Sequence, residues 1–154
     1  MRTHSILLMG IVLTLFSTQC CTGEEKKDAD KIQGTWAAVT YVQDGQGEGE
    51  KIDPKESPIR WVFKGNKVTF LADVEEASAK GTFKLDPAKK VKTIDINFPP
   101  AAGAKKGQAM LGIYEIENDT LKICYEPDGV VRPTEFKSKA GSKLILIGFK
   151  QVNK

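Results

Sequence analysis

Short segments in which apolar and polar residues alternate make up most of the chain. In "VKTIDINF" (91–98), Ile94, Ile96 and Phe98 share one face, and Asp95 and Asn97 lie on the other. This period of two residues is typical of a β-strand with one buried face. Between residues 32 and 151 the pattern predicts eight strands, in the segments 32–42, 59–71 (a hairpin of two strands), 81–86, 91–98, 108–117, 120–126 and 143–151.

Turn-forming residues separate these strands at short intervals. Gly65-Asn66 and Asn118-Asp119 suit short hairpin turns, in which positive φ angles are needed, and Pro87 suits the turn after 81–86. Consecutive hairpins favour an all-β fold, an antiparallel up-and-down barrel of eight strands, because closure of the barrel removes exposed edge strands. The alternative is a two-sheet β-sandwich.

The N-terminal region differs in composition from everything that follows. Arg2 precedes the uncharged run "SILLMGIVLTLF", and small residues follow that run. This order is typical of a secretory signal peptide, and the run is well short of the roughly 20 residues that span a bilayer. We therefore expect residues 1–20 to be a signal peptide and the protein to be exported to the periplasm or cell envelope.

Two adjacent cysteines, Cys20 and Cys21, close this region. A bacterial lipoprotein is cut just before a cysteine that then carries the lipid, so either residue is a candidate lipidation site that would anchor the protein in the membrane. The residues before both cysteines fit the usual pattern poorly, and cleavage after Gly23 is the alternative. We expect residues 21–30 to form a polar tether and residues 31–152 to form the barrel domain.

Histidine is almost absent from the chain. His4 is the only one, and it lies in the predicted signal peptide. The mature chain therefore cannot form a Ser-His or Cys-His pair, or a zinc or iron site with histidine ligands. No calcium-loop or phosphate-loop motif occurs. The 23 basic and 20 acidic side chains nearly balance, which argues against a nucleic-acid partner. The composition predicts a protein that is not an enzyme and has no cofactor or metal.

The stretch "LKICYEPDGVVRPTEF" (121–136) holds the one cysteine beyond the N-terminal region. On an extended strand Cys124 lies opposite the face of Ile123 and Tyr125, between Lys122 and Glu126 on its own face. The two charges oppose each other, so they give no net reason for a lowered thiol pKa. We interpret Cys124 as an ordinary strand residue and "PDGVVRP" as a turn; redox or nucleophilic chemistry is the alternative.

Several longer stretches carry a resemblance to a known family. They are "IQGTW", "FKGNKVTF", "GTFKLDPAKKVKTIDI" and "LGIYEIENDTLKICYEPDGVVRPTEF". Through them the segment 31–151 resembles a bacterial family of conserved domains of unknown function, best represented in planctomycetes. That family is itself similar to lipocalin-like domains, which implies an eight-stranded barrel and supplies no catalytic residues.

The lipocalin resemblance is carried by one short motif. Gly34 and Trp36 match the Gly-x-Trp pattern, in which the tryptophan plugs one end of the barrel. In lipocalins a cation from beyond the last strand packs over this indole, and Lys150 is the residue at that place. Arg132 precedes the last strand and so departs from the pattern. The alternative for Trp36 is an ordinary core position in a β fold.

The strand pattern also predicts which side chains face the barrel interior. Such a barrel is either filled by its side chains or holds one small ligand. We therefore expect non-catalytic binding of a small apolar or amphipathic ligand, with Phe63, Phe70, Phe83, Ile96 and Tyr125 as the candidate ligand-binding residues. The alternative is an envelope protein-protein interaction or structural module without a pocket, because the final strand is apolar on both faces from Leu144 to Phe149.

Overall fold

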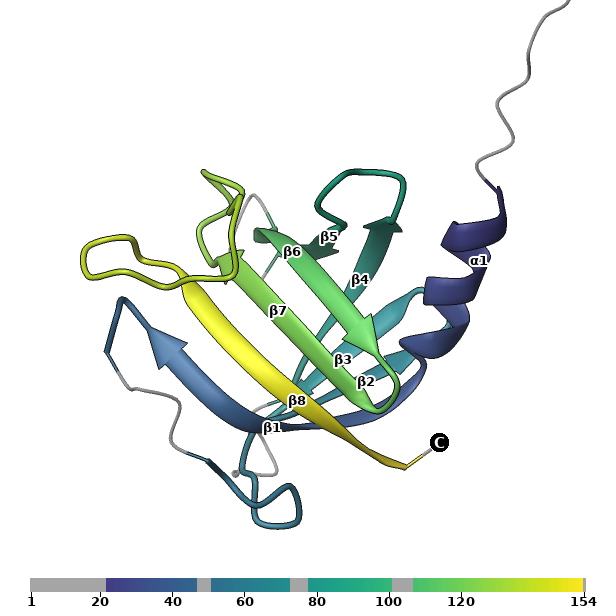
Figure 1. The fold of residues 1–154 in the computed structure, drawn as a ribbon, viewed down its shortest axis with the longest axis horizontal. Helices are drawn as coiled ribbons and strands as arrows, with labels where there is room; N and C mark the ends of the chain where they lie inside the picture. The colour runs from purple at the N-terminus through teal and green to yellow at the C-terminus, as the bar shows by residue number, and fades with distance from the viewer. Residues whose placement is uncertain (1–21, 47–50, 73–77, 101–106, 154) are drawn as a thin grey trace, which may run out of the picture.

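The computed structural model describes residues 22–46, 51–72, 78–100 and 107–153 of the chain. In this part of the chain one helix, α1, precedes eight strands that close into a barrel in sequence order (Figure 1). Every neighbouring pair is antiparallel, including β1 with β8. The predicted up-and-down barrel is confirmed, and the alternative of a β-sandwich is wrong. The elements are α1 (Thr22–Lys31), β1 (Gly34–Gln43), β2 (Arg60–Lys64), β3 (Lys67–Leu71), β4 (Ser78–Asp86), β5 (Thr93–Asn97), β6 (Ala109–Glu117), β7 (Thr120–Glu126) and β8 (Ile145–Asn153).

The predicted hairpin turns lie where the sequence placed them. Gly65 has a φ of 61° between β2 and β3, and Asn118 has a φ of 51° between β6 and β7. Both angles lie in the left-handed region that glycine and asparagine tolerate best. Each strand begins or ends within a few residues of its prediction; β8, for example, begins two residues later than the predicted segment 143–151.

The expected polar tether of residues 21–30 is wrong over most of its length, because Thr22–Lys31 form helix α1. The helix lies beside one end of the barrel (Figure 1). There the buried carboxylate of Asp28 accepts hydrogen bonds from the Tyr114 hydroxyl and the Lys92 ammonium, each at 2.8 Å. Ile32, which follows the helix, is fully buried in the core. These contacts attach α1 to the barrel.

The barrel interior holds one hydrophobic core to which every strand contributes. Its largest fully buried side chains include Trp36, Tyr114, Phe63 and Phe149. Burial of side chains of this size is the main stabilising term of such a fold, at about 1.5–3 kcal/mol for each.

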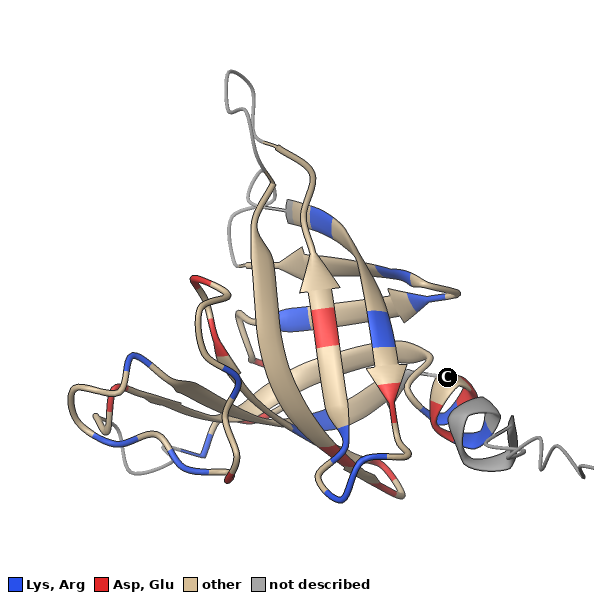
Figure 2. Ribbon diagram, turned by 90° about the horizontal axis from the view of Figure 1, so that it is seen from above, with Lys and Arg blue, Asp and Glu red and all other residues tan. Residues whose placement is uncertain are grey.

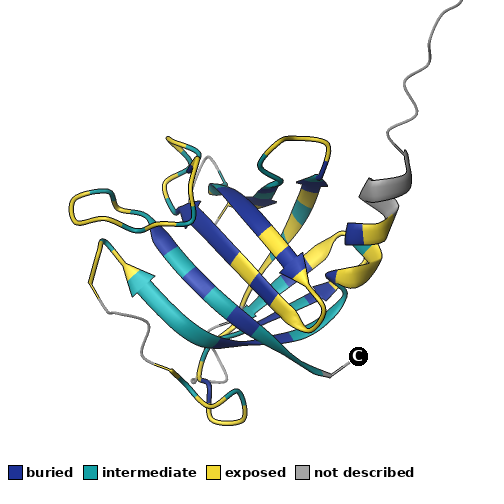
Figure 3. Cartoon of the chain, viewed as in Figure 1, coloured by how far each residue is buried: buried dark blue, intermediate teal, exposed yellow. Residues whose placement is uncertain are grey.

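A long connection packs on part of the outer wall of the barrel. The connection 127–144 joins β7 to β8. Beneath it Cys124 and Glu126 are buried, although both point away from the barrel interior, whereas Lys122 at the other end of the strand is exposed. Figure 3 shows the same change from exposed to buried along β7.

The predicted signal peptide and the candidate lipidation sites Cys20 and Cys21 lie outside the described residues. Among the helices of the described part, none combines the length and the apolar character that a membrane crossing requires.

Candidate functional site

The five candidate ligand-binding residues all lie in or against the hydrophobic core. Phe63, Ile96 and Tyr125 are buried, and Phe70 and Phe83 are half-buried against the core. The structure thus brings together the side chains that the strand pattern predicted to share the interior.

Within the core the aromatic rings contact one another directly. Trp61 stacks on Phe70 with ring centroids 4.0 Å apart, and lies 5.0 Å from Phe149 and 5.8 Å from Tyr125. Phe63 meets Phe83 edge to face at 5.0 Å. These separations are those of aromatic pairs in contact. A ligand placed between these rings would have to separate them.

Gly34, Thr35 and Trp36 lie at the start of β1. Gly34 has a φ of 116°, a conformation that favours glycine. Trp36 is fully buried, and its indole nitrogen Nε1 donates a 2.7 Å hydrogen bond to the carbonyl oxygen of Ile32. The motif therefore joins the end of α1 to the barrel core.

The expected position of Lys150 over the Trp36 ring is wrong. The Lys150 ammonium forms a 2.8 Å ion pair with Asp119 in the β6–β7 turn. Lys150 lies beside Ala37 in the β1–β8 ladder, and the alternation of the strand turns its side chain away from the interior that Trp36 occupies. In the described chain the one cation over an aromatic ring is Lys122 over Phe136, 5.5 Å from the ring centroid.

Arg132 anchors the long connection to the outer wall of the barrel. Its guanidinium donates to the carbonyl oxygen of Gly112 at 2.7 Å and to that of Ile94 at 3.4 Å, and pairs with the Asp95 carboxylate. These bonds fix the segment 132–134 across β5 and β6. The segment 132–134 lines two pockets and lies between them.

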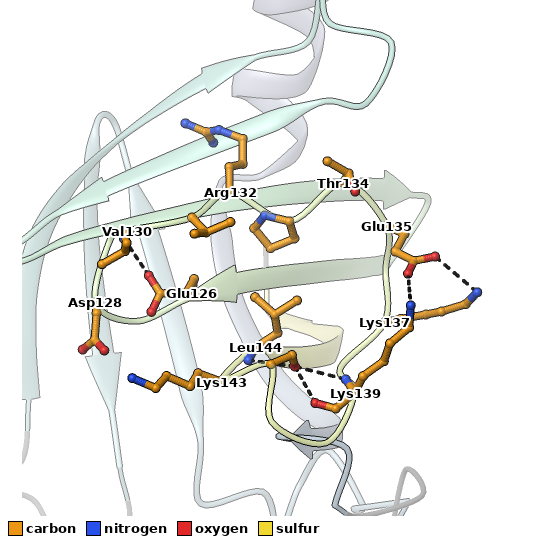
Figure 4. A pocket seen from close by; sticks show the side chains of 13 residues that line it. Glu126, Asp128, Val130, Arg132, Thr134, Glu135, Lys137, Lys139, Lys143 and Leu144 are labelled. Atoms are coloured by element: carbon orange, nitrogen blue, oxygen red, sulfur yellow. Dashed lines mark hydrogen bonds and ion pairs between the residues drawn. The ribbon is translucent and has the colours of Figure 1, made fainter.

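The first pocket, which we call the loop pocket, is a hollow of about 500 Å³ on the outside of the barrel. The connection 127–144 encloses it together with the end of β7, and its lining includes Glu126, Val131, Lys139 and Leu144. Figure 4 shows Leu144 in the middle of these side chains and the Arg132 side chain directed away from them. This volume falls in the range of roughly 300–1,000 Å³ that small-molecule sites occupy.

Two valines give the loop pocket an apolar, solvent-exposed part. Val130 is 75% exposed and Val131 is 61% exposed, and both line the pocket. Only Leu71, at 37%, joins them as an exposed large apolar residue of the described chain. Adjacent exposed apolar side chains in a hollow are typical of a binding site.

Most of the charges of the loop pocket are engaged in its own structure. The buried Glu126 carboxylate accepts a 2.7 Å hydrogen bond from the Val130 amide. Glu135 pairs with Lys139 at 2.7 Å and with Lys137 at 3.2 Å. The hydrogen bond and positive charge of Lys139, with those of Lys137, hold the pKa of Glu135 below its usual value. The Lys143 ammonium has no ion-pair partner within the residues that the structure describes.

The second pocket, which we call the turn pocket, lies on the other side of the segment 132–134. Its volume is about 520 Å³. It is lined by the outer faces of β4 and β5, by the β4–β5 connection and by Ile113 of β6. It is thus also outside the barrel.

Cys124 is a buried strand residue that lies outside both pocket linings. Its sulfur lies 3.8 Å from the carbonyl oxygen of Lys137. Burial raises the pKa of the Cys124 thiol to about 11, so the thiolate that nucleophilic chemistry needs is scarce at neutral pH. Across the described chain, no group of three or more His, Cys, Asp and Glu side chains is placed to hold a metal ion.

The apolar final strand is only partly uncovered. Ile145, Ile147 and Phe149 face the core, while Leu144 and Leu146 on the outer side are half-buried. Leu144 lines the loop pocket. Leu144 and Leu146 therefore do not form a broad exposed surface.

Strand periodicity could not predict either pocket, because the connection 127–144 encloses the first and its segment 132–134 bounds the second. The available signal was local: two valines stand between the turn residues of "PDGVVRP", where no strand can bury them. Basic and acidic residues are interspersed over the strands and connections (Figure 2).

Fold and site together define a class: a closed up-and-down β-barrel whose described pockets lie on its outer wall. Comparison of the chain with protein-family models, with curated proteins and with solved structures finds no match.

Proposed function

We propose that this protein is a non-catalytic binding module of the cell envelope, and that it takes a small apolar or amphipathic ligand in the loop pocket. The observation that carries the proposal is the pair Val130 and Val131, which remain exposed in a hollow of about 500 Å³. The candidate residues inside the barrel pack against one another, so the outer pocket is the better site.

The length of the connection supports this assignment. Eighteen residues without regular secondary structure separate Glu126 from Ile145. Connections longer than about 12–15 residues are uncommon in compact domains and are usually functional when ordered. This one is held to the barrel by Arg132 and is capped at its start by Glu126, so the pocket is preformed.

The N-terminal sequence supports the location. The pattern of residues 1–20 favours export, and lipidation at Cys20 or Cys21 would keep the barrel at a membrane. The resemblance to the planctomycete-type family and to lipocalin-like domains agrees with a non-catalytic role, since neither supplies a catalytic residue to this chain.

Native mass spectrometry of the protein purified from envelopes tests the proposal most directly. The expected result is a bound small molecule and a lipid on one cysteine. A binding assay with 1-anilinonaphthalene-8-sulfonate, an apolar fluorescent anion, then locates the site. The substitution Val131→Asp places a charge in the pocket and removes apolar contact worth about 1.5 kcal/mol, so affinity should fall by about tenfold.

The matched control is Leu71→Asp, at an exposed apolar residue of β3 that lines neither pocket. Its affinity for the probe should equal that of the unsubstituted protein. Equal loss in both variants, or no loss in Val131→Asp, would refute the loop pocket as the site.

A protein-protein interaction is the second candidate function, and the same exposed valines favour it. Adjacent exposed apolar side chains also mark interaction surfaces. Sedimentation of the purified protein over a range of concentrations separates the two. Self-association that Val131→Asp abolishes would favour the interaction, whereas a monomer that binds the probe favours the ligand pocket.

A further inference from the structure

The turn pocket has a larger excess of positive charge than the loop pocket, whose lining carries four basic and three acidic side chains. Its lining carries four basic side chains, Lys84, Lys89, Lys90 and Arg132, and two acidic ones, Asp86 and Asp95. The formal charge of this hollow is therefore positive. Ion pairs within the protein neutralise some of these cations and leave others available.

Asp95 neutralises Arg132 and not Lys84. In the β4–β5 ladder Asp95 stands directly opposite Lys84, so both lie on the outer face of the barrel. The carboxylate of Asp95 pairs instead with the Arg132 guanidinium, which the carbonyl oxygens of Gly112 and Ile94 also hold in place. Lys84 is left without an ion-pair partner within the described residues.

The two lysines of the β4–β5 turn add to this charge. Lys89 reaches Asp86 only at 4.0 Å, and the Lys89 side chain is largely exposed while that of Asp86 is partly exposed. Lys90 is exposed and has no ion-pair partner in the described part of the chain. The cations that remain available thus come from β4 and from the turn that follows it.

Apart from Thr93 and Thr134, the remaining lining of the turn pocket is apolar. Ile113 is 1% exposed, Pro133 is buried, and Val91 is half-buried. Charged lysines beside an apolar floor complement a molecule that has an anionic group and an apolar body.

We propose that the turn pocket binds a small organic anion. Its carboxylate or phosphate group lies against Lys84 and Lys90, and its apolar part rests on Ile113 and Pro133. This site is separate from the loop pocket, because the segment 132–134 stands between them. It therefore does not depend on the proposed function of the loop pocket.

The proposal is tested by titrating the purified protein with octanoate and octyl phosphate, and with octyltrimethylammonium and inorganic phosphate for comparison. The two octyl anions should bind, and added salt should weaken them because it screens exposed charges. The cationic amphiphile should not bind, and inorganic phosphate should bind more weakly because it lacks the apolar body. Vesicles containing phosphatidylglycerol distinguish a lipid headgroup from a free amphiphile as the source of the anion.

Two substitutions with opposite effects make the test specific. The double substitution Lys84→Gln with Lys90→Gln should weaken binding of the octyl anions by about fivefold. Asp95→Asn should strengthen it by about twofold, because it removes a negative charge while Arg132 keeps its two carbonyl bonds.

The matched control is Lys64→Gln with Lys67→Gln, which removes the same charge from exposed lysines beside the β2–β3 turn. An equal loss in this control would overturn the proposal, since it would show attraction to net charge alone. Binding of octyltrimethylammonium as tight as that of octanoate would overturn it as well. Loss of probe binding in Val131→Asp with unchanged octanoate binding would separate this site from the loop pocket.

Discussion

The barrel interior and the loop pocket use apolar side chains in opposite ways. Inside, residues from separate strands meet as stacked and edge-to-face rings, and Trp61 alone contacts Phe70, Phe149 and Tyr125. Outside, Val130 and Val131 stand in solvent within a hollow held by ion pairs and hydrogen bonds. The packed interior is thus distinct from the hollow that we propose as the binding site.

The physical reason is that the two regions are built by different constraints. Closure of eight short strands turns one face of each into a common interior, and interiors of this size are readily filled by side chains. The connection 127–144 packs on the outer wall without the regular alternation of a strand. Val130 and Val131 stay exposed in it, while the hydrogen bond from the Val130 amide to Glu126 and the anchor Arg132 hold it in place.

Removal of the Trp61 ring from the interior should have the largest effect on stability. Trp61→Ala should lower the free energy of unfolding by about 3–5 kcal/mol, because it leaves a cavity among four aromatic neighbours. Val131→Thr, in the loop pocket, should change it by less than about 0.5 kcal/mol, because the side chain is exposed. Urea denaturation measures both. Similar costs for the two would show that the loop pocket is part of the stabilising core.

Substitution of Arg132, which anchors the connection around the loop pocket, should have an intermediate effect on the free energy of unfolding. Arg132→Gln should cost about 1–2 kcal/mol, since the Gly112 and Ile94 carbonyls lose a charged donor. Hydrogen exchange should rise in residues 127–144 and stay unchanged in β2 and β3. The control Lys137→Gln removes only an exposed ion pair with Glu135 and should cost less than about 0.5 kcal/mol. Uniform exchange in Arg132→Gln would contradict the role of Arg132 as an anchor.

Cys124 belongs to neither the barrel interior nor the pockets, because it lies on the outer face of β7 and is nevertheless buried. Since burial raises its pKa to about 11, folding favours the neutral thiol. Its contribution to stability is complete below the unfolded thiol pKa of about 8.5 and is lost as pH rises toward 11. Burial raises the pKa of Tyr125 as well, which adds to the alkaline loss.

Iodoacetamide alkylation of the native protein should therefore show a midpoint near 11, and unfolding in urea should become easier above about pH 9. In Cys124→Ala the second effect should be reduced. A midpoint of alkylation below 7 would contradict the assignment of Cys124 as an inert strand residue.

The sequence predicted the strands well because each carries its own evidence. Alternation in "VKTIDINF" and the turn residues Gly65-Asn66 are local signals, and both were confirmed. Helix α1 was missed because "TGEEKKDADK" has no apolar stripe. It is attached to the barrel through Asp28, whose partners Lys92 and Tyr114 lie far away in the sequence. The placement of Lys150 over Trp36 failed because Asp119, in a neighbouring turn, lies within reach of the lysine.

By itself the sequence determined the strand order, the turns and the set of side chains that face inward, because period-two alternation and turn chemistry act over a few residues. Only the tertiary structure decided whether the interior is filled and where pockets form. Whether the interior is packed depends on how rings from separate strands meet, and the pockets depend on where Arg132 anchors a connection eighteen residues long. Those contacts join residues distant in the sequence, so no local pattern encodes them.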